Sequence, residues 1–227
     1  MGYNWDYLDK RAYNNRVGHY KFKKEFEFIF QYGKDHFDKA LDIAGGSGRF
    51  ALPLAEREYC QDITLIDISN EALELAKQRN PSLKIQNGDF RQIDIDDSFT
   101  LILCMEALGY FDDWNLFFGK VKNVLATKGR FIFSYQNPQS WRYGLRKLKH
   151  WKKGAYNYHE MTLVQLKQLL GTLGFEIEQM EGMNWIPLPL SSNSQWVTFF
   201  AFIEKVTHLN KWHQQSPWIL FSVKLKD

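Results

Sequence analysis

Short apolar runs alternate with helix-like segments from residue 39 onward, and this alternation restricts the fold more than any other feature of the chain. Strands are predicted at 39–44, 62–67, 83–89, 99–104 and 129–135, and helices at 48–57, 70–80 and 114–126. Pro81 ends the second helix, because proline lacks an N–H and its ring clashes with the preceding turn. Strands that are apolar almost throughout indicate a parallel sheet covered by helices on both faces.

The second part of the chain adds helices at 163–173 and 195–209 and strands at 176–183 and 218–226. Thr162 and Gln165 have the spacing of a capping box at the first of these helices. A seventh strand at the end is informative, because dinucleotide-binding domains usually finish at six. We therefore predict an α/β fold of the doubly wound type, with a mostly parallel seven-stranded sheet and helices on both faces.

Composition indicates an ordinary soluble globular protein, with 44% hydrophobic and 24% charged residues and a net charge of +3 over 227 residues. The N-terminus has no signal-peptide pattern, and no apolar run approaches the roughly 18 residues of a membrane span. Cys60 and Cys104 stand in apolar contexts without metal-ligand spacing, which predicts free thiols, no metal site and a cytoplasmic location. Eleven of the first 37 residues are aromatic. This segment must pack on something, and a lid over a ligand is one candidate.

The stretch LDIAGGSGRF, residues 41–50, places Asp42 in a strand and glycines at 45, 46 and 48 in the turn that follows. Glycines let a ligand approach the backbone at a helix N-terminus, although a tight turn without a ligand would explain them equally well. Asp67 ends the second strand, 21 residues after Gly46. That is the spacing at which an acid can hold the two ribose hydroxyls of a nucleotide.

Two kinds of nucleotide ligand fit this pattern. GSGRFA, residues 46–51, matches the dinucleotide pattern GxGxxA, so an NAD(P)-dependent enzyme is an alternative. Asp42 weighs against it, because a carboxylate beside the turn suits a cation better than a pyrophosphate. NGDF, 87–90, places Asp89 and Phe90 where they can meet the amino group and ring of adenine, although Asn, Gly and Asp also form ordinary turns. Three signals at three successive strand ends favour a cationic adenosyl ligand.

As an ordered set, these motifs resemble those of the class I S-adenosylmethionine-dependent methyltransferases. LDIAGGSGRF is similar to their glycine-rich first motif, usually D-x-G-x-G-x-G, LIDIS (65–69) to the ribose-acid motif and NGDF to the adenine motif. Residues 99–111 and 125–135 resemble the fourth-strand and fifth-strand segments. The resemblance implies an antiparallel last strand in the sheet. It also implies an enzyme of the small-molecule type that uses S-adenosylmethionine and releases S-adenosylhomocysteine.

The resemblance also implies a set of cofactor-binding positions. The glycine turn would face the methionine end, Asp67 the ribose, and Met105 the amino or sulfonium group. The full set is Asp42, Ala44, Gly45, Gly46, Gly48, Asp67, Ile68, Asp89, Phe90 and Met105. Ala44 replaces the family's first glycine, and we expect it to be tolerated at a negative φ. A domain that binds the cofactor without catalysis is an alternative for which Ala44 is the one hint.

The family has no universal base, so the catalytic candidates come from their positions. His159 precedes the helix at 163–173 and either anchors its start or acts on the acceptor. Glu106 follows the fourth strand and is either a base or a solvated acid in a loop. Tyr135 and Asn137 lie at the end of the fifth strand, where they could orient a substrate. His19 and Tyr20 are further candidates in the N-terminal segment.

Residues 141–153 contain six Lys or Arg and no acid, with an apolar stripe at helical spacing. A surface helix docked on the domain explains the segment, and a membrane-surface contact or an RNA partner are alternatives. We predict one domain, with an aromatic lid segment (1–37), a cofactor-binding half (39–135) and a substrate-side half (136–227). The expected partner is a small-molecule acceptor under the lid and region 184–217. Nucleic acid is disfavoured, and an RNA methyltransferase, whose binding would weaken steeply with salt, is the alternative.

Overall fold

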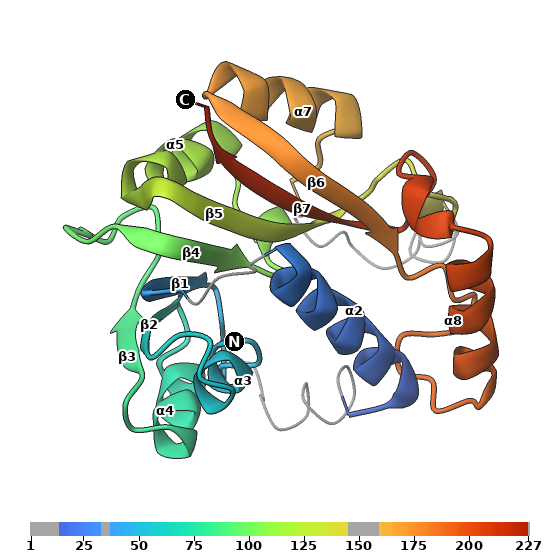
Figure 1. Ribbon diagram of the computed structural model, residues 1–227, viewed down its shortest axis with the longest axis horizontal. Coiled ribbons are helices and arrows are strands. Elements are labelled where there is room, and N and C mark those ends of the chain that lie inside the picture. The colour runs from blue at the N-terminus through green and yellow to red at the C-terminus, as the bar shows by residue number, and fades with distance from the viewer. Residues whose placement is uncertain (1–13, 33–36, 145–158, 227) are drawn as a thin grey trace.

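Seven strands form one sheet in the order β3-β2-β1-β4-β5-β7-β6 (Figure 1). The computed structural model describes residues 14–32, 37–144 and 159–226. The strands are β1 (Lys39–Ile43), β2 (Asp62–Asp67), β3 (Lys84–Asn87), β4 (Phe99–Cys104), β5 (Leu125–Gln136), β6 (Phe175–Met183) and β7 (Trp218–Leu225). Neighbours among β1 to β5 pair in parallel, and β7 pairs antiparallel to both β5 and β6. The predicted fold class, including the antiparallel last strand, is confirmed.

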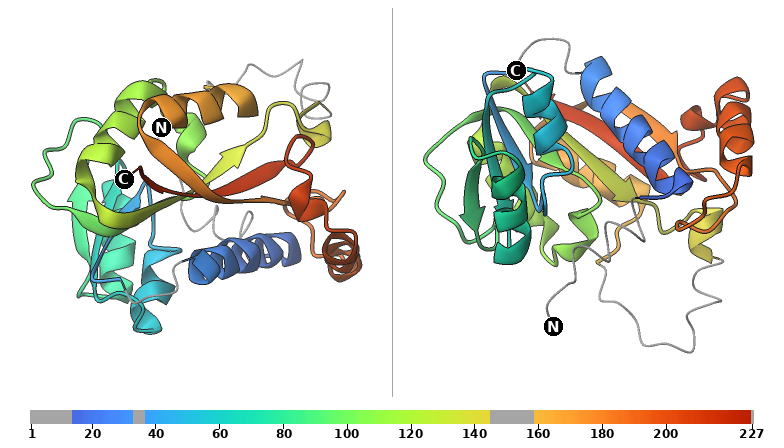
Figure 2. Two further views of the ribbon diagram at one scale, coloured as in Figure 1. Left: turned by 45° about the horizontal axis from the view of Figure 1, so that its top comes forward. Right: turned by 90° about the horizontal axis from the view of Figure 1, so that it is seen from below.

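Helices cover both faces of the sheet (Figure 2). They are α2 (Arg16–Tyr32), α3 (Ala51–Glu56), α4 (Asn70–Arg79), α5 (Trp114–Val124), α7 (Leu163–Thr172) and α8 (Trp196–Val206), with short 3₁₀ turns at Leu108–Tyr110 and Leu209–Lys211. The capping box of Thr162 and Gln165 is present at the start of α7. The helix expected at 48–57 begins at Ala51, because the preceding residues form the glycine turn.

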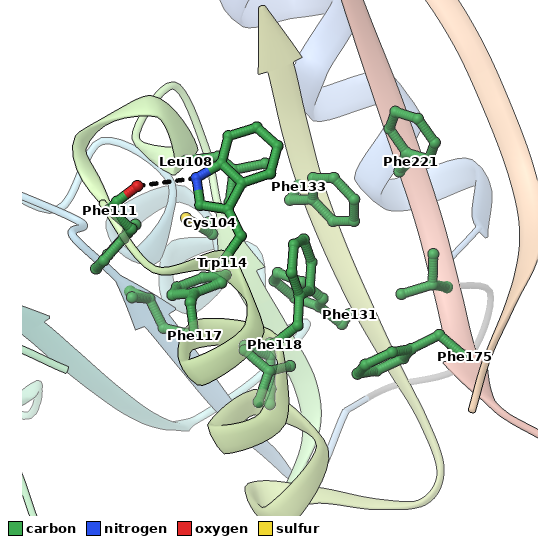
Figure 3. Packing of buried hydrophobic residues seen from close by; sticks show 14 of the residues in the cluster. Cys104, Leu108, Phe111, Trp114, Phe117, Phe118, Phe131, Phe133, Phe175 and Phe221 are labelled. Atoms are coloured by element: carbon green, nitrogen blue, oxygen red, sulfur yellow. Dashed lines mark hydrogen bonds between the residues drawn. The ribbon is translucent and has the colours of Figure 1, made fainter. Parts of the chain in front are cut away.

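The core under α5 and α7 is aromatic, and Figure 3 shows its packing. The rings of Phe133 on β5 and Phe221 on β7 stack with centroids 4.9 Å apart, and Phe118 of α5 packs edge-on against Phe133. Large buried aromatic side chains contribute strongly to the hydrophobic stabilisation of a domain. This cluster therefore fastens β7 to the middle of the sheet.

The opposite core includes the N-terminal helix. Phe26, Phe28 and Ile29 of α2 are buried in one cluster with Leu103 of β4 and Ile132 of β5. The described part of the predicted lid segment is thus mainly helix α2, which packs in the core. Its aromatic residues stabilise the sheet, and a lid function stays a proposal.

Most of the basic segment 141–153 lies outside the described residues. Residues 141–144 are helical, and the guanidinium group of Arg142 donates hydrogen bonds to the carbonyl oxygens of Ile186, at 2.6 Å, and Leu188. Arg142 therefore fastens the loop after β6. Within residues 14–32, 37–144 and 159–226, no helix combines the length and apolar character needed to cross a membrane.

Candidate functional site

The carboxyl ends of six strands meet at one edge of the sheet, because β1 to β6 all run in the same direction. The glycine turn follows β1 at this edge, and Asp67, Asp89 and Met105 lie at or just after the ends of β2, β3 and β4. Ligands of doubly wound sheets bind at this edge. The fold thus brings the sequence-predicted cofactor positions to one place.

In the glycine turn every second residue has a left-handed backbone conformation, with φ of 55° at Ala44, 55° at Gly46 and 82° at Gly48. The expectation that Ala44 has a negative φ is wrong, and a residue with a Cβ is strained there. Gly45 is required for another reason. A Cβ on it would lie 2.4 Å from Leu65 Cδ1 and 2.6 Å from Asp42 Cγ, so the turn packs directly on the strands below.

Asp42 lies fully buried beneath this turn, and its Oδ2 has no hydrogen-bond partner among the described residues. Burial, followed by the negative charge of Asp67, raises the pKa of Asp42 to about 7. A nearby positive charge would stabilise the ionised form of such a carboxylate. The unpartnered acid therefore fits a cationic ligand at this edge.

Asp67 joins the turn to β2. Its Oδ2 accepts a hydrogen bond from the Gly46 N–H at 2.9 Å, and its Oδ1 accepts one from the Ser69 N–H at 2.8 Å. Burial raises the pKa of Asp67, and the hydrogen bonds from the backbone of Ser69 and Gly46 oppose that rise. Each carboxylate oxygen keeps a second lone pair for a ligand. Ile68, which follows directly, is 75% exposed and offers an apolar surface beside this acid.

The end of β3 differs from the expectation. Asp89 is held by Arg91, with Nη2 2.7 Å from Oδ2, and this hydrogen bond lowers the pKa of Asp89. Phe90 is buried in the core, with its ring centroid 5.6 Å from that of Phe117. The ring is therefore not available to adenine in this arrangement, because it fills the space under α5.

A cavity of about 680 Å³ lies between the loop after β3, the start of α5 and the segment before α7. Its lining includes Arg91, Asp112, Trp114, Leu116, His159 and Glu160. His159 is exposed here, and its backbone N–H donates a hydrogen bond of 3.1 Å to the Gly109 carbonyl. Of the three catalytic candidates, His159 is the one with a side chain beside an open cavity.

Tyr135 and Asn137 hold loops in place. The buried Tyr135 hydroxyl donates a hydrogen bond of 2.6 Å to the Met161 carbonyl, and burial raises the pKa of Tyr135 above its usual value. Nδ2 of Asn137 donates to the carbonyl oxygens of Gln214, at 2.8 Å, and Ser216, at 3.1 Å. These contacts assign both residues a supporting role at the ends of β5 and β7.

Glu106 lies in an ion-pair cluster instead of solvent. Its carboxylate is 2.7 Å from Nζ of Lys21 on α2 and 2.7 Å from Nη1 of Arg49 in the glycine turn. Burial alone would raise the pKa of Glu106, but the two cations outweigh burial and lower it. A carboxylate with a depressed pKa is a weak proton acceptor. The geometry thus makes Glu106 a link between the turn and α2.

Lys21 and Glu25 were missed by the reasoning from sequence. Both are buried on α2, on one stripe with Val17 and Phe28. Burial, and then the charge of Glu106, raises the pKa of Glu25. Charged residues within an otherwise apolar helical stripe are a signal that could have identified this cluster.

A second polar group joins α2, α8 and the end of β6. The Tyr20 hydroxyl donates to Oε2 of Glu204 and accepts a hydrogen bond of 3.3 Å from the Asn184 N–H. Oε2 of Glu204 also accepts one of 3.2 Å from the Trp185 N–H. The Asn184 side chain is 0% exposed, and neither its Nδ2 nor its Oδ1 has a partner among the described residues. Tyr20 was a candidate from sequence, whereas Asn184 and Glu204 were not.

Comparison with known proteins gives an independent view of the chain. A family model described as a methyltransferase domain matches residues 34–201. The demethylmenaquinone methyltransferase of Deinococcus radiodurans is 29% identical over 112 residues, which cover 47% of this chain and 46% of that protein. The chain therefore matches less than half the length of the curated relatives.

Solved structures share the fold. The magnesium protoporphyrin IX methyltransferase of Synechocystis PCC 6803, solved with bound S-adenosylhomocysteine, superposes with a TM-score of 0.67 at 13% identity, covering 100% of this chain and 90% of that one. The N-methyltransferase NodS of Bradyrhizobium japonicum WM9 superposes with a TM-score of 0.61 at 16% identity, covering 94% and 98%.

Proposed function

Because this chain belongs to the family of methyltransferase domains, we propose that it uses S-adenosylmethionine to methylate an oxygen or nitrogen atom of a small-molecule acceptor. The cofactor supplies a methyl group already activated by the sulfonium charge. The work left to the chain is to hold the cofactor, to align the acceptor atom with the methyl group and to exclude water.

The residues at the strand ends suit the cofactor. We assign the ribose hydroxyls to Asp67 and the face of the adenine to Ile68, which is exposed beside it. Asp42, with an unpartnered oxygen under the glycine turn, favours the positive charge of the methionine end. The backbone at Gly45, Gly46 and Met105 lines the same edge, and Asp89 can meet the adenine amino group if it exchanges its bond to Arg91.

The buried amide of Asn184 is the observation that carries the small-molecule assignment. A fully buried amide that has no partner among the described residues is costly, because it has given up its hydrogen bonds to water. Tyr20 contacts the backbone of Asn184, and the next residue, Lys21, contacts Glu106 at the end of β4. Adjacent residues of α2 therefore connect Asn184 to the cofactor edge. An acceptor with its own donors and acceptors would satisfy the amide.

His159 is the residue we propose as proton acceptor when the acceptor atom is a hydroxyl. It lies beside the cavity of about 680 Å³, and imidazole is the usual base near neutral pH. The Glu106 carboxylate is engaged by two cations, and the Tyr135 hydroxyl by a carbonyl. We therefore do not propose Glu106 or Tyr135 as the base.

An RNA acceptor has weaker support. Arg142, the first basic residue of the segment 141–153, is directed to main-chain carbonyl groups. Two of the relatives above are named for transfer to demethylmenaquinone and to magnesium protoporphyrin IX, which are small molecules. Those names support a small acceptor without identifying it.

The test is release of S-adenosylhomocysteine in the presence of a panel of small hydroxyl and amine compounds, and separately of total RNA. The variant Asn184→Gly removes the amide and tolerates the φ of 68° at this position. We expect it to retain thermal stabilisation by S-adenosylhomocysteine and to lose turnover of the small acceptor. Turnover equal to that of the wild type would exclude Asn184 from the acceptor site. Turnover of RNA alone, falling steeply with salt, would overturn the small-molecule assignment.

A further inference from the structure

The outer face of α8 carries a stripe of large apolar side chains. Trp196, Phe199, Phe202 and Val206 are 62%, 49%, 59% and 49% exposed, and Trp212 just beyond the helix is 61% exposed. Their spacing along α8 places them on one side of the helix. Isolated exposed apolar residues are ordinary on a protein surface, but a contiguous group marks a binding face. We refer to Trp196, Phe199, Phe202 and Val206 as the α8 face.

The other side of α8 is already used for packing. Val197 is buried with Val17 of α2 and Ile186, and Phe200 packs against this cluster. Glu204 is turned inward to Tyr20. The helix is therefore apolar on both sides, and only its inner side is covered by the described residues. A surface helix of an ordinary globular protein is polar on its outer side.

Within residues 184–217, the exposed Lys, Arg, Asp and Glu side chains are of one sign. Between residues 184 and 217, Glu204 is the sole acidic residue, and it is buried. Lys205 and Lys211 are both exposed in the same region. A segment that presents tryptophan, phenylalanine and lysine without an exposed carboxylate of its own is complementary to the interface of an anionic bilayer.

The position of α8 suits such a contact. In all three views α8 lies at one end of the molecule, beside α2 and away from α3 and α4 (Figures 1 and 2). We propose that the α8 face, with Lys205 and Lys211, docks this protein on the surface of a membrane that contains anionic lipids. The aromatic side chains enter the headgroup region and the lysine ammonium groups contact lipid phosphates and carboxylates.

Vesicle co-sedimentation tests the proposal. We expect the full chain to sediment with vesicles of phosphatidylcholine and phosphatidylserine at low salt, and much less with phosphatidylcholine alone. The triple variant Trp196→Gln, Phe199→Gln, Phe202→Gln should weaken partitioning by more than about tenfold. Lys205→Gln and Lys211→Gln should each weaken only the component that depends on phosphatidylserine, by about fivefold.

The matched control is Leu116→Gln with Val164→Gln, which removes apolar side chains that are 51% and 60% exposed on α5 and α7. This control should bind vesicles as the wild type does. Equal binding by the triple variant, or equal loss in the control, would overturn the proposal. A third outcome is that the wild type does not bind vesicles but forms dimers, and that the triple variant is monomeric. This outcome would overturn the membrane proposal and assign the α8 face to contact with a second copy of the chain.

Discussion

The backbone N–H of Gly46 donates a hydrogen bond of 2.9 Å to Oδ2 of Asp67, so the glycine turn is fastened to the end of β2. The Ser69 N–H donates a hydrogen bond of 2.8 Å to Oδ1, the other carboxylate oxygen of Asp67. One side chain therefore sets the position of the turn and presents the acid that we assign to the ribose. A ligand that binds Asp67 also meets a turn that is already in place.

Replacing Asp67 by alanine is expected to abolish the stabilisation by S-adenosylhomocysteine. At a ligand concentration 100 times its Kd, the wild type should gain about 2.7 kcal/mol, which corresponds to a rise in Tm of roughly 5–10 °C. The measurement is thermal unfolding with and without the ligand. Asp62→Ala, at the opposite end of β2, is the matched control and should keep the shift. An unchanged shift in Asp67→Ala would remove the ribose assignment.

Ala44→Gly should stabilise the protein. Ala44 has a φ of 55°, where a Cβ is strained, and glycine relieves that strain. We expect the free energy of unfolding to rise by about 1 kcal/mol, after the larger unfolded-state entropy of glycine is subtracted. Denaturant unfolding measures it. Ala40→Gly in β1, where the backbone is extended, should destabilise, and a loss in both variants would contradict the strain.

Asp42→Asn should make the free energy of unfolding less dependent on pH. The pKa of Asp42 is raised to about 7 by burial and by Asp67, so the folded state binds the proton more tightly than the unfolded state. Stability from this group is present below about pH 4 and is lost as the pH rises to about 7. Asparagine avoids that loss, so at pH 8 the variant should be more stable by about 2–4 kcal/mol.

The same variant tests the charge of the ligand. Asparagine carries no negative charge, so Asp42→Asn should bind S-adenosylmethionine more weakly than the wild type at pH 8. Wild-type affinity for it should also rise with pH through the range near 7, as Asp42 ionises. Calorimetric titration at pH 6 and pH 8 would show this. Equal affinity of variant and wild type at both pH values would place the cation elsewhere.

Glu106→Gln and Glu25→Gln should differ sharply, although both remove a carboxylate from one cluster. Glu106 neutralises Lys21 and Arg49, so its loss leaves two cations partly buried and should cost about 3 kcal/mol or more. Burial raises the pKa of Glu25, so glutamine costs little there. Wild-type stability falls as the pH rises from the usual glutamate pKa toward that raised value, and Glu25→Gln should remove that decline. If denaturant unfolding showed Glu106→Gln and Glu25→Gln to be equally destabilised at all pH values, the predicted difference between the two carboxylates would be contradicted.

The elements with a local signal were predictable from the sequence. The capping box at Thr162 and the turn after β1 follow from residues close together in the chain, because capping and glycine conformations are local properties. The alternation of strands and helices was enough to predict the sheet, and the resemblance to a family added the antiparallel last strand. The spacing of Gly46 and Asp67 indicated that they act together, and the structure joins them directly.

Features set by packing between distant segments were not predictable. The direction of the Phe90 side chain depends on α5, which provides Phe117 as its neighbour. Glu106 follows a strand, so its position in the sequence suggests a solvated acid in a loop, but α2 places Lys21 beside it. In each case the deciding contact lies outside the local sequence.

The place of β7 between β5 and β6 has a consequence for biosynthesis. Among the described strands, β6 is hydrogen-bonded to β7 alone, although β6 is translated well before residues 218–225. While the nascent chain lengthens, β5 and β6 thus each present an open strand edge that can pair with other chains. The sheet closes only when β7 leaves the ribosome and inserts between them. Truncation just before Trp218 is expected to give a chain that ribosome-associated chaperones retain.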